Sequence, residues 1–377
     1  MNILHVLSQY EVNGVETHVA TIAEERARNG LGLTIVSDTF STPVPVEVLY
    51  RPIGKRDYRQ RISNIAFLIN LIKKKNIQIV NAHSRAASWV SYFATRFTRT
   101  PLISTIHMRQ HMHLSTKHVP VYGEKLIPVC KAISDHLQED LGYTPDRLAL
   151  IHNAIDLDHW TFDPHRANRS GRKIVSFVGR FSGFKGDNLL VIIDKIFPEV
   201  LKQYGNIQFH IVGGISGTAR IVEAVERTNR AMGREFIFLK GFTTELRKVY
   251  QEADVVIGSG RVAMEALASG NLVVSIGEGG DIGIISERTR DRAVYSNFGD
   301  LDTRKPINIE NSVRSIVTAL EHPDIVEPAW GRKLIREQYD SKAVIAMLNG
   351  LYDTLTIHRH PAPASTREPG HHAVVEI

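Results

Sequence analysis

The sequence predicts an α/β fold made of two doubly wound, Rossmann-like domains. Short apolar segments alternate with segments of helical character along most of the 377 residues. Most of these segments are continuously apolar, which is typical of parallel strands covered by helices on both faces. A polar stretch, residues 163–171, interrupts the alternation, and a second set of strands follows it at once. We therefore expect two parallel sheets that face a central cleft, where open α/β sheets bind their ligands.

Each expected domain has its own strands. The first domain, residues 1–165, is expected to contain strands at 3–7, 32–37, 77–82, 102–106, 126–129 and 148–152. The second domain, residues 172–328, is expected to contain strands at 174–178, 207–212, 236–239, 254–257 and 272–275. Residues 329–355 predict terminal helices. The last segment, 356–377, has three prolines and four histidines without periodicity, which predicts disorder.

Composition limits the class of protein. The chain has one cysteine, Cys130, so no disulfide can form within it, as is usual in a reducing compartment. Residues 2–7 are too short for a signal segment, and no apolar run reaches the length of a membrane span. We therefore expect a cytoplasmic protein. A net charge of +6 favours anionic ligands or an anionic membrane surface. Nucleic acid is the alternative partner, but no nucleic-acid-binding motif supports it.

Two motifs in the second half carry the strongest chemical signal. Residues 177–186 place Arg180 and Lys185 on a glycine-rich loop after an expected strand. Two fixed cations suit a diphosphate, and the glycines would let backbone N–H groups approach it. Residues 258–270 place Glu265 in the first turns of a helix, where its carboxylate suits the vicinal hydroxyls of a ribose. Together the motifs predict a socket for a nucleoside-diphosphate sugar. Two surface cations and a helix-dipole partner are the structural alternatives.

Further candidates lie on loops after expected strands. Asn13 and Gly14 follow the first strand, and His83 and His107 each follow a strand at its carboxyl end. The second domain adds one cation and several glycines whose backbone N–H groups suit a donor, although plain turns explain several of them equally well: Gly179, Gly213, Gly260, Arg261, Gly279 and Gly280.

No metal site is expected. His111 and His113 lie near His107, but no carboxylate or cysteine is close to them in the sequence. Two acidic triplets, residues 156–158 and 300–302, are interpreted as an inter-domain loop and a surface turn.

On these residues the chain resembles the retaining glycosyltransferases of family four, which have the GT-B fold. The resemblance covers nearly the whole chain. It rests on residues 13–18, on 151–156, where Ala154 replaces the usual glycine, and on the two motifs described above. It implies transfer of a hexose from a nucleoside-diphosphate sugar, a UDP-sugar as the first expectation, to a hydroxyl acceptor with retention. It also implies that no cofactor and no metal take part, and that the last helix crosses back onto the first domain.

The resemblance implies roles for single residues as well. Arg180 and Lys185 would stabilise the charge on the departing diphosphate, and His107 would lie beside the donor sugar. From their positions after strands, Asn13 and His83 are expected to face the acceptor, although a structural role explains His83 equally well. The acceptor is expected to be a glycan or a lipid-linked molecule in cell-envelope polysaccharide or lipopolysaccharide synthesis.

One position departs from the family pattern. Ile257 stands where the first of two glutamates is usual, and Glu265 matches the second. This departure keeps open one alternative, a non-catalytic scaffold that binds sugar nucleotides. A second alternative is a nucleotide-sugar epimerase of the same fold, which needs acid/base carboxylates near the sugar, and Ile257 does not supply one.

Residues 57–76 predict a helix with basic surroundings. Apolar residues recur at helical spacing, at positions 58, 62, 65, 69 and 72. Eight cations surround this stripe: Arg51, Lys55, Arg56, Arg59, Arg61, Lys73, Lys74 and Lys75. The simpler interpretation is a crossover helix with a solvated basic face. The functional alternative is a patch that contacts the inner face of the cell membrane and a lipid-linked acceptor.

Overall fold

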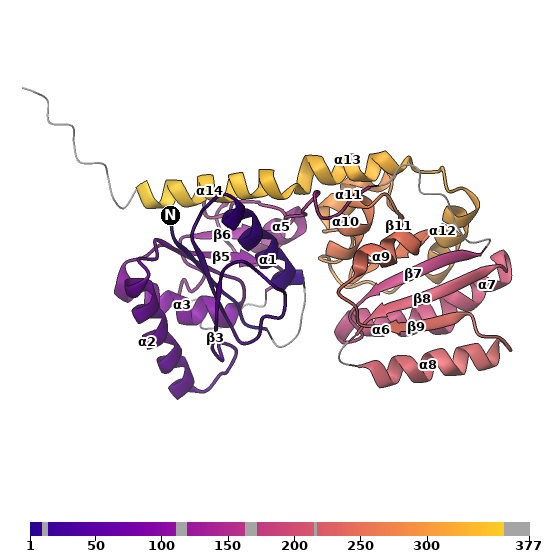
Figure 1. Cartoon of the computed structure of the whole chain (residues 1–377), viewed down its shortest axis with the longest axis horizontal. Helices are drawn as coiled ribbons and strands as arrows, with labels where there is room; N and C mark the ends of the chain where they lie inside the picture. The colour runs from indigo at the N-terminus through magenta and orange to yellow at the C-terminus, as the bar shows by residue number, and fades with distance from the viewer. Residues whose placement is uncertain (10–13, 111–118, 163–171, 215–216, 358–377) are drawn as a thin grey trace, which may run out of the picture.

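The computed structural model describes residues 1–9, 14–110, 119–162, 172–214 and 217–357. Two six-stranded sheets form two α/β domains that lie side by side (Figure 1). The predicted linker at 163–171, Asn13, His111, His113 and most of the predicted disordered tail lie outside the described residues. The described part of the tail, Thr356 and Ile357, continues the last helix.

The first domain is built on a fully parallel sheet with the strand order β3-β2-β1-β4-β5-β6. Strands β1, β2, β4 and β5 are buried at every position, and each combines apolar side chains with one or two buried polar ones, as expected for a parallel sheet covered on both faces. The strands are β1 Ile3–Val6, β2 Leu33–Ser37, β3 Glu47–Tyr50, β4 Ile79–Ala82, β5 Leu102–Ile106 and β6 Lys125–Pro128. The helices are α1 Gly14–Arg28, α2 Tyr58–Lys74, α3 Arg85–Thr98 and α5 Lys131–Glu139, with a 3-10 turn at Pro145–Arg147.

The second domain has the strand order β12-β11-β10-β7-β8-β9, and β12 alone of these strands runs antiparallel. The strands are β7 Lys173–Gly179, β8 Ile207–Gly213, β9 Ile237–Gly241, β10 Val255–Ile257, β11 Leu272–Gly277 and β12 Gly280–Ile284. The helices are α6 Gly183–Val191, α7 Phe197–Tyr204, α8 Thr218–Ala231, α9 Leu246–Glu252, α10 Arg261–Ala268, α11 Arg290–Tyr295 and α12 Ile309–Glu321, with a π-helical turn at Ile192–Ile196 and a 3-10 turn at Glu287–Thr289.

Ten of the eleven predicted strands are present, with ends shifted by two residues or fewer. The expected strand at 148–152 is wrong, because this segment makes only a single parallel bridge, from Leu148 to Leu126, before it leaves the sheet. Two strands were not predicted. The edge strand β3 is largely exposed, and β12 begins with a glycine, so neither has the apolar run of a buried parallel strand.

Two terminal helices, α13 Pro328–Tyr339 and α14 Ser341–Ile357, run across both domains (Figure 1). Leu334 and Ile335 of α13 belong to a core of the second domain, whereas Val344 and Leu348 of α14 belong to a core of the first. Tyr352 of α14 accepts a hydrogen bond at its hydroxyl from the Asn81 amide nitrogen of β4, at 3.0 Å. The last helix therefore packs on the first domain.

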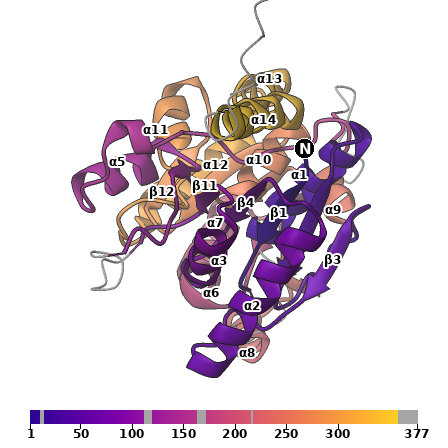
Figure 2. The same ribbon diagram turned by 90° about the vertical axis from the view of Figure 1, so that its left-hand side faces the viewer.

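Helix α2 lies on the outside of the first domain, next to α3 (Figure 2). Its buried positions are Asn64, Leu68, Leu71 and Ile72, and the Asn64 amide donates to the Pro52 carbonyl at 3.0 Å. The helix predicted over residues 57–76 is present, and the C-terminal part of its apolar stripe packs in the core of the first domain. Tyr58 and Ile62 of that stripe are exposed to solvent. Within the described residues, no helix combines the length and the apolar character needed to cross a membrane.

Candidate active site

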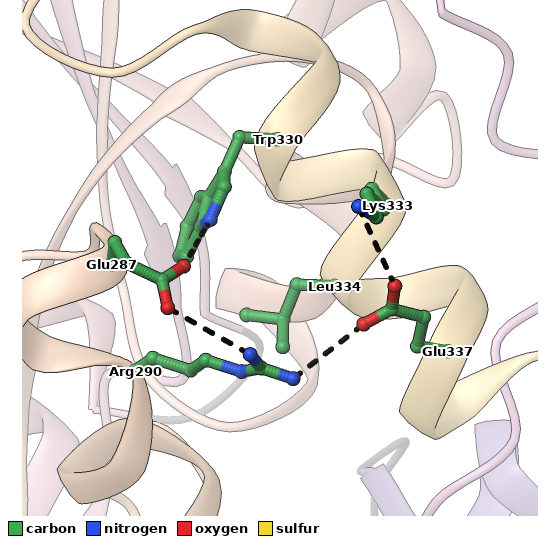
Figure 3. A pocket seen from close by; sticks show the side chains of 6 residues that line it. All are labelled: Glu287, Arg290, Trp330, Lys333, Leu334 and Glu337. Carbon is green, nitrogen blue, oxygen red and sulfur yellow. Dashed lines mark hydrogen bonds and ion pairs between the residues drawn. The ribbon is translucent and has the colours of Figure 1, made fainter.

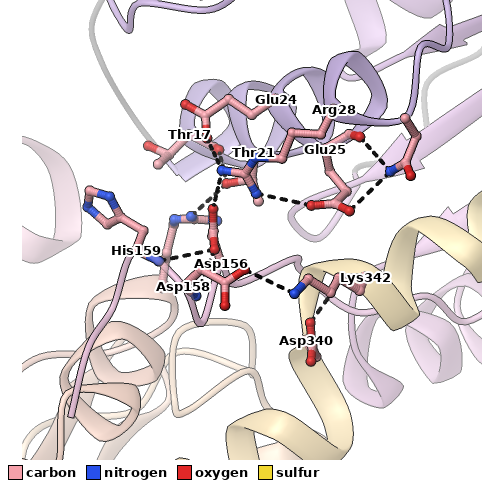
Figure 4. A network of polar contacts seen from close by, with 12 residues as sticks. Thr17, Thr21, Glu24, Glu25, Arg28, Asp156, Asp158, His159, Asp340 and Lys342 are labelled. Carbon is pink, nitrogen blue, oxygen red and sulfur yellow. Dashed lines mark hydrogen bonds and ion pairs between the residues drawn. The ribbon is translucent and has the colours of Figure 1, made fainter.

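Polar contacts hold the segment after residue 152 to helices α1 and α14 (Figure 4). Arg28 of α1 pairs with Asp156 at 2.8 Å, and Lys342 of α14 pairs with Asp158 at 3.0 Å. These ion pairs fix the segment between the first domain and the crossing helix. Leu157 packs in a core of the second domain, so the triplet at 156–158 is an inter-domain element, as predicted.

Lys185 lies in the first turn of α6, after β7, and forms an ion pair with Asp300 at 3.0 Å. The Ser259 hydroxyl donates to the same carboxylate at 3.0 Å. Arg180 is exposed at the carboxyl end of β7. The structure therefore places both predicted cations where strands of the second sheet end. It also adds a carboxylate that the sequence interpretation had assigned to a surface turn.

The turn that carries Asp300 is strained and packed against the first domain. Asn297 and Phe298 have positive φ angles of 53° and 55°, which cost on the order of 1 kcal/mol or more each in residues other than glycine. Phe298 is buried, and Leu301 belongs to a core cluster with Ile106 of β5. The surface-turn interpretation of residues 300–302 is therefore wrong, because the turn is held between the two domains.

Ile257, the position of the missing glutamate, is fully buried at the end of β10. Two carboxylates from other segments lie at this end of the sheet. Asp300 contacts Ser259, two residues beyond Ile257, and Glu278 follows β11. Burial raises the pKa of Glu278 and Asp300 raises it further, while Lys185 and Arg109 of the first domain oppose the shift.

Glu265 is buried in α10, with 3% of its surface exposed. One carboxylate oxygen accepts from Arg261 Nε at 2.7 Å, and the other accepts from the Tyr250 hydroxyl at 3.2 Å. Burial raises the pKa of Glu265, and the hydrogen bonds from Arg261 and Tyr250 oppose that shift. Both oxygens of the Glu265 carboxylate thus have protein partners, and the predicted contact with a ribose would require one of these hydrogen bonds to break.

Arg261 joins the two domains. Its Nη1 donates to the Ala154 carbonyl at 2.9 Å, and its Nη2 donates to the Thr21 hydroxyl of α1 at 3.0 Å. With Nε on Glu265, every nitrogen of the guanidinium group has a protein partner. The predicted contact between Arg261 and a phosphate or an acidic sugar would require some of these bonds to break.

Glycines at the end of β8 and in α6 lie close to residues 179–181, at the end of β7. A Cβ on Gly214 would lie 1.9 Å from the Phe181 ring, and a Cβ on Gly186 would lie 2.0 Å from the Phe181 carbonyl oxygen. A Cβ on Gly213 would lie 2.0 Å from the Gly179 carbonyl oxygen. The close approach that these glycines permit is therefore between β7, β8 and α6, and it shapes the loop that holds Lys185.

The other predicted glycines lie at the edges of the same region. Gly14 begins α1, and a Cβ there would meet no atom within 4 Å. Gly260 precedes α10 with φ at 60°, and a Cβ there would lie 2.5 Å from Asp300 Oδ2. The Gly279 amide donates to the Gly299 carbonyl at 3.0 Å, and Gly280 begins β12. The turns at Gly260 and Gly279 thus both contact the loop at 296–302.

Four histidines meet in the first domain, and the sequence had indicated two of them. His83 after β4 contacts His5 of β1 at 2.8 Å and His107 after β5 at 3.0 Å, ring nitrogen to ring nitrogen. His18 of α1 packs edge-on against His107, with ring centroids 5.2 Å apart. Burial lowers the pKa of His5 and of His107 to about 3. These imidazoles are therefore neutral near neutral pH.

His83 is buried, and both its ring nitrogens contact other histidines. Its predicted acceptor-side role is therefore withdrawn, because no polar atom of the ring is left for an acceptor. His107 is partly exposed and keeps its place at the strand end. Among the described residues, no group of three or more His, Cys, Asp or Glu side chains is arranged to hold a metal ion.

A separate pocket lies beside α13 (Figure 3). Its Trp330 Nε1 donates to Glu287 at 2.6 Å, and Arg290 contacts both Glu287 and Glu337, at 3.7 and 3.5 Å. The polar groups of this pocket bind one another, and we assign no ligand to it.

Comparison with known proteins follows the same division into domains. The model named Glycosyltransferase Family 4 matches residues 12–159, and the model named Glycosyl transferases group 1 matches residues 172–296. The D-inositol 3-phosphate glycosyltransferase of Mycobacteroides abscessus is 30% identical over 331 residues, which cover 74% of this chain and 73% of that protein.

Solved structures show the same architecture. A glycosyltransferase from Rickettsia africae superimposes with a TM-score of 0.73 at 19% identity, over 94% of this chain and 98% of the other. Anabaena HepE, in complex with UDP and glucose, superimposes with a TM-score of 0.70 at 17% identity, over 94% and 99% of the two chains. The chain therefore belongs to the group 1 glycosyltransferases of family four and has the GT-B fold.

Proposed function

We propose that this glycosyltransferase moves a hexose from a nucleoside-diphosphate sugar to a hydroxyl acceptor, with retention and without a metal ion. The observation that carries the proposal is the position of one ion pair. Lys185 pairs with Asp300 at the strand ends of the second domain, and the turn that carries Asp300 packs against the first domain. A UDP-sugar is the first candidate donor, since Anabaena HepE has been solved with UDP-glucose and with UDP and glucose.

Lys185 and Arg180 would bind the diphosphate. As the bond between the anomeric carbon and the diphosphate breaks, negative charge grows on the leaving oxygen. Cations fixed beside that oxygen stabilise the transition state more than the ground state. Lys185 would exchange its bond to Asp300 for a bond to phosphate. Asp300, held by Ser259, would remain beside the sugar as the carboxylate that position 257 lacks.

The nucleoside would lie near α10. One oxygen of Glu265 would exchange its bond to Arg261 or to Tyr250 for a ribose hydroxyl. The turns at Gly14, Gly260, Gly279 and Gly280 would line the donor. Retention follows from a front-face reaction. The acceptor oxygen bonds to the anomeric carbon on the side that the diphosphate leaves, and a diphosphate oxygen takes the acceptor proton.

A membrane contact would supply a lipid-linked acceptor for cell-envelope glycan synthesis. Tyr58 and Ile62 of α2 and Phe97 of α3 are 77%, 67% and 74% exposed. Arg59 of α2 and Arg96 of α3 are near neighbours of these residues in the sequence. Large apolar side chains among cations suit the interface of an anionic membrane.

The proposal is tested by incubating the protein with UDP-, GDP-, ADP- and CMP-sugars and a panel of hydroxyl acceptors, in EDTA. Proton NMR of the product reports the configuration of the new bond. We expect one UDP-sugar to give a product with the donor's anomeric configuration. Inversion would contradict the mechanism. A donor isomer formed without acceptor would favour the epimerase alternative.

A further inference from the structure

Three histidines of the first domain form one row from the buried sheet toward the second domain. His5 Nδ1 lies 2.8 Å from His83 Nε2, and His83 Nδ1 lies 3.0 Å from His107 Nε2. In each contact one ring nitrogen must donate and the other must accept. A neutral imidazole has a single N–H, so the direction of one bond in the row fixes the direction of the other.

The row has only two arrangements when its members are neutral. Burial lowers the pKa of His5 and of His107 to about 3 and lowers that of His83 well below its ordinary value. Near neutral pH, therefore, the protons lie either on Nδ1 of all three rings or on Nε2 of all three rings.

The buried end of the row distinguishes these arrangements. His5 is fully buried, and its Nε2 has no hydrogen-bond partner among the described residues. Protons on Nε2 would leave a buried N–H without an acceptor, which folded proteins almost never contain. Protons on Nδ1 leave a lone pair there, and an unsatisfied acceptor is tolerated more often.

We propose that His5 and His83 are positioning residues that hold His107 in the tautomer with its proton on Nδ1. His107 then offers an N–H at the partly exposed end of the row. The identity of its ligand, an oxygen of the transferred hexose, rests on the proposed function. A histidine that donates there cannot at the same time accept the proton of the acceptor hydroxyl. The row therefore makes His107 a binding group for the sugar and leaves the proton to the diphosphate.

Nitrogen-15 NMR of the full-length protein, labelled at histidine, reads the tautomer directly at neutral pH. Histidine-to-asparagine variants at each position assign the signals. We expect His5, His83 and His107 all to carry the proton on Nδ1. A proton on Nε2 of His107 in the wild-type protein would overturn the proposal.

His5→Leu and His5→Asn form the matched pair of variants. Leucine removes the donor, whereas the amide nitrogen of asparagine can take the place of Nδ1. We expect both tautomers of His107 in His5→Leu, with kcat lower by at least about twofold and KM for the donor raised, because molecules with the wrong tautomer lose a hydrogen bond to the sugar. His5→Asn should keep the wild-type tautomer and most of kcat. An unchanged tautomer and kcat in His5→Leu would show that His5 does not position His107.

The NMR readout needs no turnover, so the two proposals can fail separately. The expected tautomer in a protein that transfers no sugar would contradict the proposed function and leave the row intact. Should His5→Leu fail to fold, the wild-type spectrum and His5→Asn still decide the direction of the row.

Discussion

The two domains bring opposite chemistry to the region where they meet. The first domain contributes neutral rings, with His83 and His107 joined by hydrogen bonds and held neutral by burial. The second contributes charges in pairs, Lys185 with Asp300 and Arg261 with Glu265. A neutral group can orient a sugar without attracting the diphosphate, whereas a cation can hold the diphosphate. On the proposed function, the first domain would orient the sugar through neutral groups, and the second would stabilise the leaving diphosphate and place Asp300 beside the sugar.

The largest effect is expected from removing the cations of the second domain. Arg180→Ala with Lys185→Ala should lower transfer by about ten-thousandfold, if each lost contact costs about a hundredfold and the two add. Steady-state transfer with the best UDP-sugar measures this effect. Lys202→Ala, on the surface of α7, is the control and should retain full activity. Transfer within tenfold of wild type in the double variant would remove these cations from the diphosphate site.

Arg261→Ala tests the second charged pair. The variant leaves Glu265 buried without its cation and should lower the free energy of unfolding by about 3–5 kcal/mol. Urea unfolding at neutral pH measures the loss. Adding Glu265→Gln should recover most of it, because no charge is then buried. Equal stability of Arg261→Ala and wild type would mean that the pair does not hold the domains.

The same variant has a pH dependence whose sign follows from the pKa of Glu265. Burial raises this pKa above the ordinary value of 4.5, and Arg261 opposes the shift, so the variant should raise it further. A carboxyl group whose pKa is higher in the folded state than in the unfolded state lowers the free energy of unfolding as the pH rises from 4.5 through the folded-state pKa. The loss in free energy of unfolding caused by Arg261→Ala should therefore become smaller as the pH is lowered from 7 toward 5. A deficit that grows on acidification would contradict this account.

Asp300→Asn tests whether this carboxylate stands in for the absent glutamate. Transfer should fall about tenfold, the loss expected for one hydrogen bond to a charged group. Affinity for free UDP should not decrease, because Lys185 loses a competing anion. Asp302→Asn, two residues along the same turn, is the matched control. Full transfer activity in Asp300→Asn would mean that Asp300 only holds Lys185 in place while no donor is bound.

The smallest effect concerns the outer surface of the first domain. Tyr58→Ser with Ile62→Ser should weaken binding to vesicles that contain anionic phospholipid by about fivefold, since exposed apolar side chains lose about 1 kcal/mol of burial. Vesicle sedimentation measures the change. Met347→Ser, at an apolar residue of α14 that is 54% exposed, is the control. If the wild-type protein does not sediment with such vesicles, a membrane contact by this face is ruled out.

Much of the fold was predictable because burial on both faces of a parallel sheet demands continuous apolar strands. Strand β10, Val255–Ile257, shows this pattern in the sequence itself. The edge strand β3 and the antiparallel β12 do not, because one is exposed and the other is rich in glycine. Their places depend on pairing with β2 and β11, and such pairing leaves no local pattern.

The site was predictable where a residue follows a strand directly. Lys185 and His107 were found in this way, because strand ends meet at one edge of a sheet. Asp300 was missed, since its place depends on a turn with two residues at positive φ and on packing against the other domain. His5 and His18 were missed because each is an isolated histidine in an apolar segment. Only the fold brings them to His83 and His107.

Calorimetric titration of the wild-type protein and of Lys185→Ala with UDP-, GDP-, ADP- and CMP-sugars, all in EDTA, tests the central claim most directly. We predict that a UDP-sugar binds the wild type without metal and binds Lys185→Ala at least tenfold more weakly, with the fold of the variant unchanged. Binding that needs a divalent metal, or equal affinity of the two proteins, would contradict the assignment of the diphosphate to Lys185.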